Sequence, residues 1–169
     1  MPNWAENDLI VRGPKKDMEK MVEECFSDED GAKCPDFNKI VPYPTKFSDM
    51  DKAAEPIMDA IMKGTHKGPM PKDGFNSGGY DWCIKNWGTK WDAKDARKFS
   101  VSANTLKVTF DTAWSPPKPV ILALAKKYPT LEITLKSYEA GMQYKALLKL
   151  KGDKVIADGS SDYNGNRGG

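Results

Sequence analysis

The chain has 169 residues, of which 39% are apolar and 30% are charged, and its net charge is +2. This composition predicts one water-soluble domain and gives no general signal for nucleic-acid binding. No apolar run approaches the roughly 18 residues of a membrane-spanning helix and the first residues do not resemble a secretion signal, so we expect a cytoplasmic protein without a membrane partner.

The first elements in chain order are a strand and an amphipathic helix. Residues 8–12 predict a short strand, which Gly13 ends. Residues 15–26 predict a helix because apolar side chains recur at three- and four-residue spacing, namely Met18, Met21, Val22, Cys25 and Phe26.

The next part of the chain is rich in glycine and proline. Residues 27–47 predict mainly loop, with a short extended piece at 39–41. Residues 64–79 contain five glycines and two prolines and predict a mobile or irregular loop. A short helix over 80–87 is expected to follow.

Between these loops, residues 48–63 predict a second helix. Ser48 followed by Asp51 resembles a capping pair at its start. Pro56 is expected either to open this helix late or to kink it, because proline lacks the N–H group that a helix interior needs.

The spacing of apolar residues then changes from the helical three- and four-residue pattern to strict alternation. Residues 99–103 and 106–110 predict a hairpin around Asn104 and Thr105. Ser115 is expected to cap a helix that carries Val120, Ile121, Leu124, Ala125 and Tyr128 and ends at Pro129.

Three more strands are expected after this helix. They cover 131–135, 143–150 and 154–157, and the last two are joined by a turn at Gly152. The glycine-rich residues 159–169 predict a flexible tail.

In order, these elements give an α+β chain with a ferredoxin-like, split β-α-β antiparallel sheet and helices on one face. We expect a single domain over 1–158, with a long helical insertion at about 27–97 and an extra C-terminal β-hairpin. The other face of the sheet is expected to be covered by the insertion or left to a partner.

The densest unusual segment is residues 80–92, which contain Trp82, Trp87 and Trp91 among polar side chains such as Lys90 and Asp92. These indoles could stack on a base or a sugar, but we favour the interpretation that they anchor the insertion onto the sheet. Trp114 has the same two interpretations, and anchoring is again favoured.

Charge is unevenly distributed along the chain. Residues 1–62 carry fourteen acidic and eight basic side chains, whereas residues 118–154 carry eight lysines and three acids. Lysine-rich helix backs and strand faces explain this more simply than a functional basic surface does, although both interpretations stay open.

Catalytic and metal-binding patterns are sparse. Cys25, Cys34 and Cys83 form no C-x-x-C pair, and the single histidine, His66, lies in a glycine-rich loop. No spacing distinguishes the carboxylates near the aromatic segments, which are Asp81, Asp92, Asp111 and Glu139. We therefore expect no catalytic residues, no metal site, no cofactor and a reducing compartment.

Five segments of the chain, taken in sequence order, resemble the sequence pattern of one known family. They are PNW at 2–4, FNKIVPYP at 37–44, NWGTKWD at 86–92, FDTAWSPP at 110–117 and YEAG at 138–141. The chain resembles the YubB-type ferredoxin-like proteins of phages, plasmids and genomic islands. The resemblance implies the ferredoxin-like fold and a mobile-element context, and it assigns no functional residue.

Three hypotheses of function follow. The favoured one is a non-enzymatic accessory protein of a phage or other mobile element that binds, and could inhibit, a bacterial host protein such as a defence component. The alternative is a nucleic-acid or nucleotide-binding module, and a metal-dependent hydrolase is the least favoured. The candidate binding residues are Trp82, Trp87, Lys90, Trp91, Asp92, Trp114 and Glu139.

Overall fold

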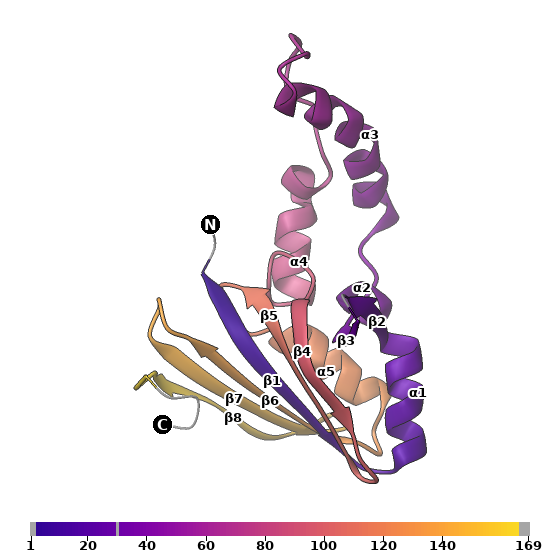
Figure 1. Cartoon of the computed structure of the whole chain (residues 1–169), viewed down its shortest axis with the longest axis vertical. Coiled ribbons are helices and arrows are strands. Elements are labelled where there is room, and N and C mark those ends of the chain that lie inside the picture. The colour runs from indigo at the N-terminus through magenta and orange to yellow at the C-terminus, as the bar shows by residue number, and fades with distance from the viewer. Residues whose placement is uncertain (1–2, 30, 166–169) are drawn as a thin grey trace.

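The computed structural model describes residues 3–29 and 31–165, and over these residues the main feature is a six-stranded antiparallel sheet (Figure 1). The strand order is β4-β5-β1-β6-β7-β8. The strands are β1 (Trp4–Arg12), β4 (Lys94–Val101), β5 (Thr105–Ala113), β6 (Glu132–Glu139), β7 (Tyr144–Lys151) and β8 (Lys154–Asp162).

Helices and a second, two-stranded sheet complete the chain. The helices are α1 (Lys15–Cys25), α2 (Phe37–Ile40), α3 (Thr45–Met62), α4 (Tyr80–Asn86) and α5 (Lys118–Lys127), with a π-helical turn η1 (Phe75–Gly79). The small sheet pairs β2 (Phe26–Glu29) with β3 (Ala32–Pro35).

The expected ferredoxin-like topology is confirmed. The path β1-α1-β4-β5-α5-β6 places β1 between β5 and β6, and β4 lies at the far edge beside β5. The β7–β8 hairpin pairs with β6 and extends the sheet on the other side. The extra C-terminal hairpin is therefore also confirmed.

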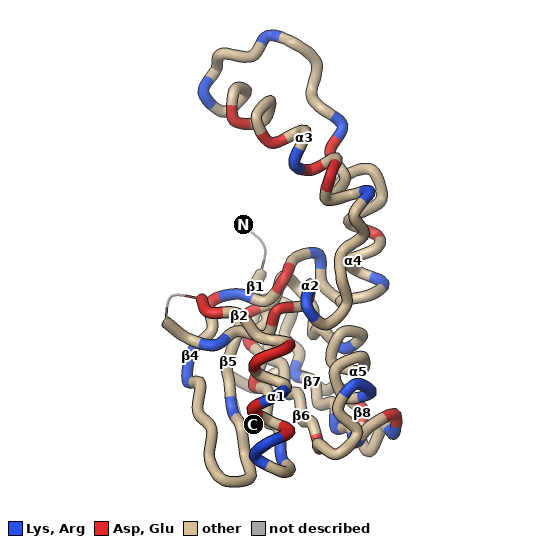
Figure 2. The backbone as a smooth tube through the Cα atoms, turned by 90° about the vertical axis from the view of Figure 1, so that its right-hand side faces the viewer, with Lys and Arg blue, Asp and Glu red and all other residues tan. Residues whose placement is uncertain are grey.

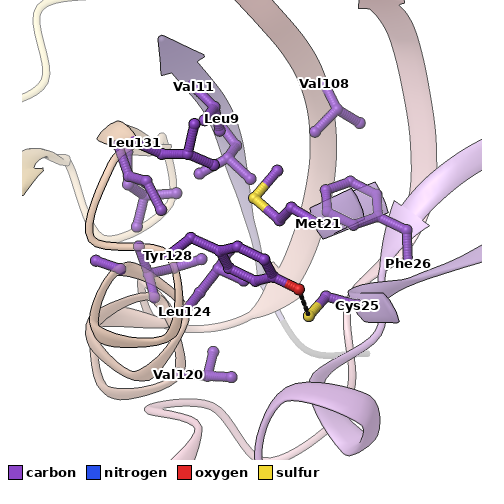
Figure 3. Packing of buried hydrophobic residues seen from close by; sticks show 14 of the residues in the cluster. Leu9, Val11, Met21, Cys25, Phe26, Val108, Val120, Leu124, Tyr128 and Leu131 are labelled. Carbon is purple, nitrogen blue, oxygen red and sulfur yellow. Dashed lines mark hydrogen bonds between the residues drawn. The ribbon is translucent and has the colours of Figure 1, made fainter. Parts of the chain in front are cut away.

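The core lies between the sheet and the helices α1 and α5. Side chains alternate along a strand, so β1 directs Leu9 and Val11 towards the helices, where both are fully buried. Met21 of α1 and Leu124 of α5 pack against them (Figure 3). Burying each such side chain contributes about 1.5–3 kcal/mol to stability.

Tyr128 joins the two helices at the rim of this core. Its hydroxyl donates to Glu24 Oε2 at 2.6 Å. The same hydroxyl lies 3.6 Å from Cys25 Sγ (Figure 3). Lys127 Nζ lies 3.3 Å from the same Glu24 oxygen. The hydrogen bonds from Tyr128 and Lys127 lower the pKa of Glu24, which keeps the link charged at neutral pH.

Several strands are longer than the sequence pattern indicates. β1 begins at Trp4 rather than at residue 8, because residues 4–7 continue its alternation and pair with β5. Residues 159–162 belong to β8 rather than to a flexible tail, since they pair with residues 144–147 of β7. Residues 166–169 of the expected tail lie outside the described residues.

The segment after α1 differs from the expected loop. Residues 26–29 and 32–35 form the paired strands β2 and β3, and residues 37–40 form helix α2 rather than an extended piece. Asp36 caps α2 by accepting from the amide of Lys39 at 2.9 Å. A second carboxylate, that of Asp92, accepts from the amide of Phe37 at 2.8 Å. The helix is thus stabilised by a residue far away in sequence.

Both expected helix caps are wrong. Helix α3 begins at Thr45 with Pro44 as its N-cap, and Asp51 accepts instead from the amide of Phe75 at 2.9 Å. Helix α5 has Pro117 as its N-cap, while the hydroxyl of Ser115 donates to the Gly88 carbonyl at 2.6 Å. Asp51 and Ser115 thus make tertiary contacts, and the Ser48 hydroxyl donates to the Thr45 carbonyl at 3.1 Å inside the helix.

Residues 44–79, which we call the arm, leave the body of the molecule. The arm contains α3 and η1 and extends beyond one end of the sheet, in both views of the molecule (Figures 1 and 2). It therefore does not cover the open face of the sheet. Pro56 lies in the middle of α3.

The described part of the chain contains no helix with the length and apolarity that crossing a membrane requires.

Candidate functional site

Aromatic and lysine side chains form a row at the end of the sheet from which the arm projects. Lys90 Nζ lies 3.9 Å from the ring centroids of both Trp91 and Trp114. Trp91 continues the row to Trp4 with ring centroids 5.9 Å apart, and Lys94 Nζ lies 4.4 Å from the Trp4 ring. We call Lys94, Trp4, Trp91, Lys90 and Trp114 the tryptophan–lysine row.

The two indoles on either side of Lys90 are exposed to solvent. Trp91 is 40% exposed and Trp114 is 41% exposed. A lysine ammonium over an indole face is attracted by the ring electrons, by about 0.5–2 kcal/mol per contact. Lys90 therefore holds the two rings in a fixed relation while their outer surfaces stay accessible.

Trp114 has an unusual backbone conformation. Its φ is +69°, in the left-handed region that bulky residues rarely adopt. Hydrogen bonds hold it there: its N–H donates to the Asn3 carbonyl at 2.9 Å, and its carbonyl accepts from the Tyr144 hydroxyl at 3.0 Å. These contacts fix the indole at the surface, in a conformation that costs about 1–3 kcal/mol.

The other two tryptophans of residues 80–92 have a structural role. Trp87 is 6% exposed, and its indole N–H donates to the Val41 carbonyl at 2.8 Å. Trp82 meets it edge to face at 5.5 Å. Trp87 also contacts Phe37, whose ring contacts Phe110 of β5. They anchor the inserted segment on the sheet, as favoured from the sequence.

Asp92 directly follows Trp91, and its side chain binds backbone amides of the inserted segment. Its carboxylate accepts from the amides of Phe37 and Ala93, both at 2.8 Å, and from that of Asn38 at 3.4 Å. Burial raises the pKa of Asp92 to about 6, although these hydrogen bonds favour the charged form. Asp92 is therefore a structural cap of α2 with a pKa close to neutrality.

Glu139 lies at the same end of the sheet as Trp114 and is the last residue of β6. It is 3% exposed, and its carboxylate accepts from the amides of Gly141, at 2.9 Å, and Met142. Glu139 pairs across the strands with Tyr144, the residue whose hydroxyl supports Trp114. Glu139 therefore lies opposite Tyr144, the residue that supports Trp114 of the row.

The carboxylates considered for a hydrolytic metal site have separate partners. Asp111 binds Arg97 at 2.9 Å, and Asp81 is exposed on α4, whereas Asp92 and Glu139 cap backbone amides. Within residues 3–29 and 31–165, no group of three or more His, Cys, Asp or Glu side chains is close enough to hold a metal ion.

A cavity of about 190 Å³ adjoins the row on the side of the arm. Its walls include Lys90, Trp91 and the ring of Tyr43, whose hydroxyl is buried and has no hydrogen-bond partner within the described structure. Burial, together with the nearby carboxylate of Asp51, raises the pKa of Tyr43. The cavity is mostly apolar and is smaller than typical ligand pockets of about 300–1,000 Å³.

Of the residues predicted for a site, the structure brings Lys90, Trp91 and Trp114 together at the surface. Glu139 is linked to them only through Tyr144, whose hydroxyl donates to the Trp114 carbonyl. Trp4 and Lys94 were missed, although Trp4 begins the alternation that continues into β1.

Comparison with known proteins supports the fold. Residues 86–166 match the family model described as the ferredoxin-like domain in Api92-like protein. The crystal structure of protein Api92 from Yersinia pseudotuberculosis superposes with a TM-score of 0.55 over 98% of this chain and 99% of that chain, at 11% sequence identity. No curated protein matches the sequence. The segment 86–166, which includes β4 to β8, is thus similar to the ferredoxin-like domain of Api92-like proteins, and at this identity the similarity of the whole chains concerns the fold alone.

Proposed function

We propose that this chain is a non-enzymatic accessory protein of a phage or other mobile element, and that it binds a protein of the bacterial host through the tryptophan–lysine row. The observation that carries the proposal is the pair of exposed indoles, Trp91 and Trp114, held on either side of Lys90.

The chemistry of the row fits a protein partner. Tryptophan is enriched among the few residues that dominate binding energy at protein interfaces, because it buries a large surface at little entropic cost. The row presents two such rings that are already oriented by Lys90. A partner that covers them would gain apolar burial without first ordering the side chains.

The backbone of Trp114 supports the same proposal. A left-handed conformation at a bulky residue reduces stability and persists only where surrounding contacts impose it. In the core, such strain would be offset by burial, but the indole of Trp114 is 41% exposed. Strain that serves to display a ring at the surface favours a binding role for that ring.

The mobile-element context comes from the resemblance to YubB-type proteins, carried by the segments at 37–44, 86–92 and 110–117. Two of these segments supply residues of the row. The proposed partner is therefore a protein of the bacterial cytoplasm, such as a component of host defence, and the chain acts by occupying it.

The proposal is tested by affinity capture from a bacterial lysate, followed by calorimetry with the captured protein in purified form. We expect the unmodified chain to bind one partner and the Trp91→Ala/Trp114→Ala variant to bind it at least about 100-fold more weakly, since two hot-spot residues are truncated.

The matched control is Leu122→Ala, which removes a side chain of similar exposure, 40%, from helix α5. This variant should bind like the unmodified chain. If the double tryptophan variant retains full affinity, or if no partner is captured while the protein turns over a substrate, the proposal is wrong.

A further inference from the structure

The sheet face opposite the helices is a second surface, which adjoins the tryptophan–lysine row at Lys94. Alternation along the strands assigns Asp8 and Ile10 of β1, Lys107 of β5 and Lys136 of β6 to this face, because their neighbours in sequence fill the core. The arm projects past the end of the sheet and does not cover this face (Figures 1 and 2).

Basic side chains outnumber acidic ones on this open face. Two observations place basic residues on this face, namely the strand register and the lining of a hollow in the face. The basic residues are Arg12, Lys94, Arg97, Lys98, Lys107, Lys136, Lys145, Lys149 and Lys151. The acidic residues placed there in the same way are Glu6, Asp8, Asp111 and Glu132. The lysine-rich segment 118–154 thus supplies four of the cations on this face.

Neighbouring groups already engage the acids. Arg97 binds Glu6 and Asp111, each at 2.9 Å. Glu132 lies 3.2 Å from Lys149 and 3.9 Å from Arg12. The face therefore has excess positive charge that its own carboxylates cannot balance.

A hollow of about 550 Å³ lies in the middle of this face. Its lining includes Lys98, Lys107 and Lys136, together with Ile10 and the ring of Tyr138. Asp8 is the one acidic residue of this lining, and its carboxylate accepts from the Thr109 hydroxyl at 2.7 Å. The volume falls within the range of known ligand sites. Lysines around an apolar and aromatic floor provide contacts both to phosphates and to the faces of bases.

We propose that the open face of the sheet binds single-stranded nucleic acid, with Lys107 and Lys136 contacting phosphates and the hollow receiving bases. A single strand fits because its unpaired bases can enter the hollow. A duplex is read by an element that enters its groove, whereas this surface is recessed. The proposal goes beyond protein binding by the row and does not depend on it.

The test is fluorescence anisotropy with labelled oligothymidine and oligouridine of about 20 nucleotides, at salt concentrations from about 50 to 200 mM. We expect binding that weakens linearly on a log–log plot as salt rises, because each lysine–phosphate contact releases counterions. Lys107→Gln/Lys136→Gln should weaken binding at least about tenfold and flatten that slope.

The matched control is Lys16→Gln/Lys126→Gln, which removes the same charge from exposed positions on α1 and α5. The affinity of this control for the oligonucleotides should fall less than about threefold, because only the long-range attraction by the net positive charge of the protein is reduced. Circular dichroism of both variants checks that each is folded.

Three results would overturn the proposal. They are no binding at the lowest salt, equal losses in the two double variants, and equal or tighter binding of a duplex or of polyglutamate. The last result would assign the face to a duplex or to an acidic peptide. Capture of the protein partner by the row is measured separately, so either proposal can fail alone.

Discussion

At the scale of single residues, Trp114 shows how backbone strain and display of a side chain are connected. Its φ of +69° suits glycine better than any residue with a Cβ. The Asn3 carbonyl and the Tyr144 hydroxyl bind its backbone and hold the tryptophan in this conformation.

We therefore predict that Trp114→Gly is more stable than Trp114→Ala by about 1 kcal/mol, because both variants lose the indole but only alanine keeps the strain. The measurement is the free energy of unfolding in denaturant. Trp91 gives the control, since its φ is not positive: there, glycine should be no more stable than alanine. Equal stabilities of the two Trp114 variants would contradict the strain.

Asp92 gives stability a pH dependence. Burial raises its pKa in the folded chain from the ordinary 3.8 to about 6. Between pH 4 and pH 6 the unfolded chain therefore loses this proton while the folded chain keeps it, and stability falls as the pH rises. Above about pH 6 both states are charged and the loss is complete.

We predict that, relative to Asp92→Asn, the unmodified chain loses roughly 3 kcal/mol of unfolding free energy as the pH rises from about 4 to above 6. Asparagine can still accept through one oxygen from the amides of Phe37 and Ala93, so the variant should remain folded. Denaturant unfolding at several pH values measures the difference. A difference that stays constant with pH would show that the Asp92 pKa is ordinary.

At the scale of elements, sequence periodicity predicted those parts of the fold whose partners are neighbours in sequence. Helix α1 and the β4–β5 hairpin carry clear helical and alternating patterns, and both exist. Helix α2 could not be predicted, because part of its N-terminal capping comes from Asp92, 55 residues after Phe37. A four-residue helix has no periodic signal of its own.

The candidate site was only partly predictable for the same reason. Trp87 and Trp91 belong to one motif, yet the first is buried and the second is exposed. The chain changes direction between them at Gly88, whose φ is +85° and where a Cβ would lie 2.5 Å from Pro119 Cδ. That close approach to α5 depends on the tertiary fold, so composition alone could not separate the two roles.

Helix α3 illustrates an element with little support from the rest of the molecule. Only Phe47 and Ala54 are buried along its 18 residues, and Pro56 interrupts its hydrogen bonding. Proline in a helix interior costs about 3 kcal/mol. Local opening of α3 should therefore need much less free energy than global unfolding.

We predict that Pro56→Ala slows amide hydrogen exchange in α3 by a factor that corresponds to as much as about 3 kcal/mol, while exchange in β1 and β6 is unchanged. Glu55→Ala, at an exposed neighbouring position, is the control and should change exchange little. Unchanged protection in the Pro56 variant would mean that the arm opens by a route that does not involve α3 hydrogen bonds.

At the scale of the whole molecule, the fold separates three surfaces. The tryptophan–lysine row lies at the end of the sheet, the basic face lies opposite the helices, and the arm stands away from both. The lysines that a linear count finds in residues 118–154 divide between the open face and helix α5. Lys94 belongs to both the row and the basic face, but the residues chosen for substitution, Trp91 and Trp114 in the row and Lys107 and Lys136 on the face, do not overlap.

The arm contributes no residue to the main core cluster identified among the described residues. The side chain of Tyr43, next to the first residue of the arm, reaches the last, because a Cβ at Gly79 would lie 1.9 Å from the Tyr43 hydroxyl. We therefore predict that replacing residues 46–77 by a linker of about four glycines and serines preserves a cooperative unfolding transition, within a few degrees of the original midpoint. A compact chain of 169 residues has a radius of gyration of roughly 15 Å, and the projecting arm should raise the measured value above this. In the shortened chain, the radius of gyration from X-ray scattering should fall to about 14 Å. Loss of the cooperative transition would show that the arm supports the sheet through Tyr43 and Trp82, the aromatic residues at its base.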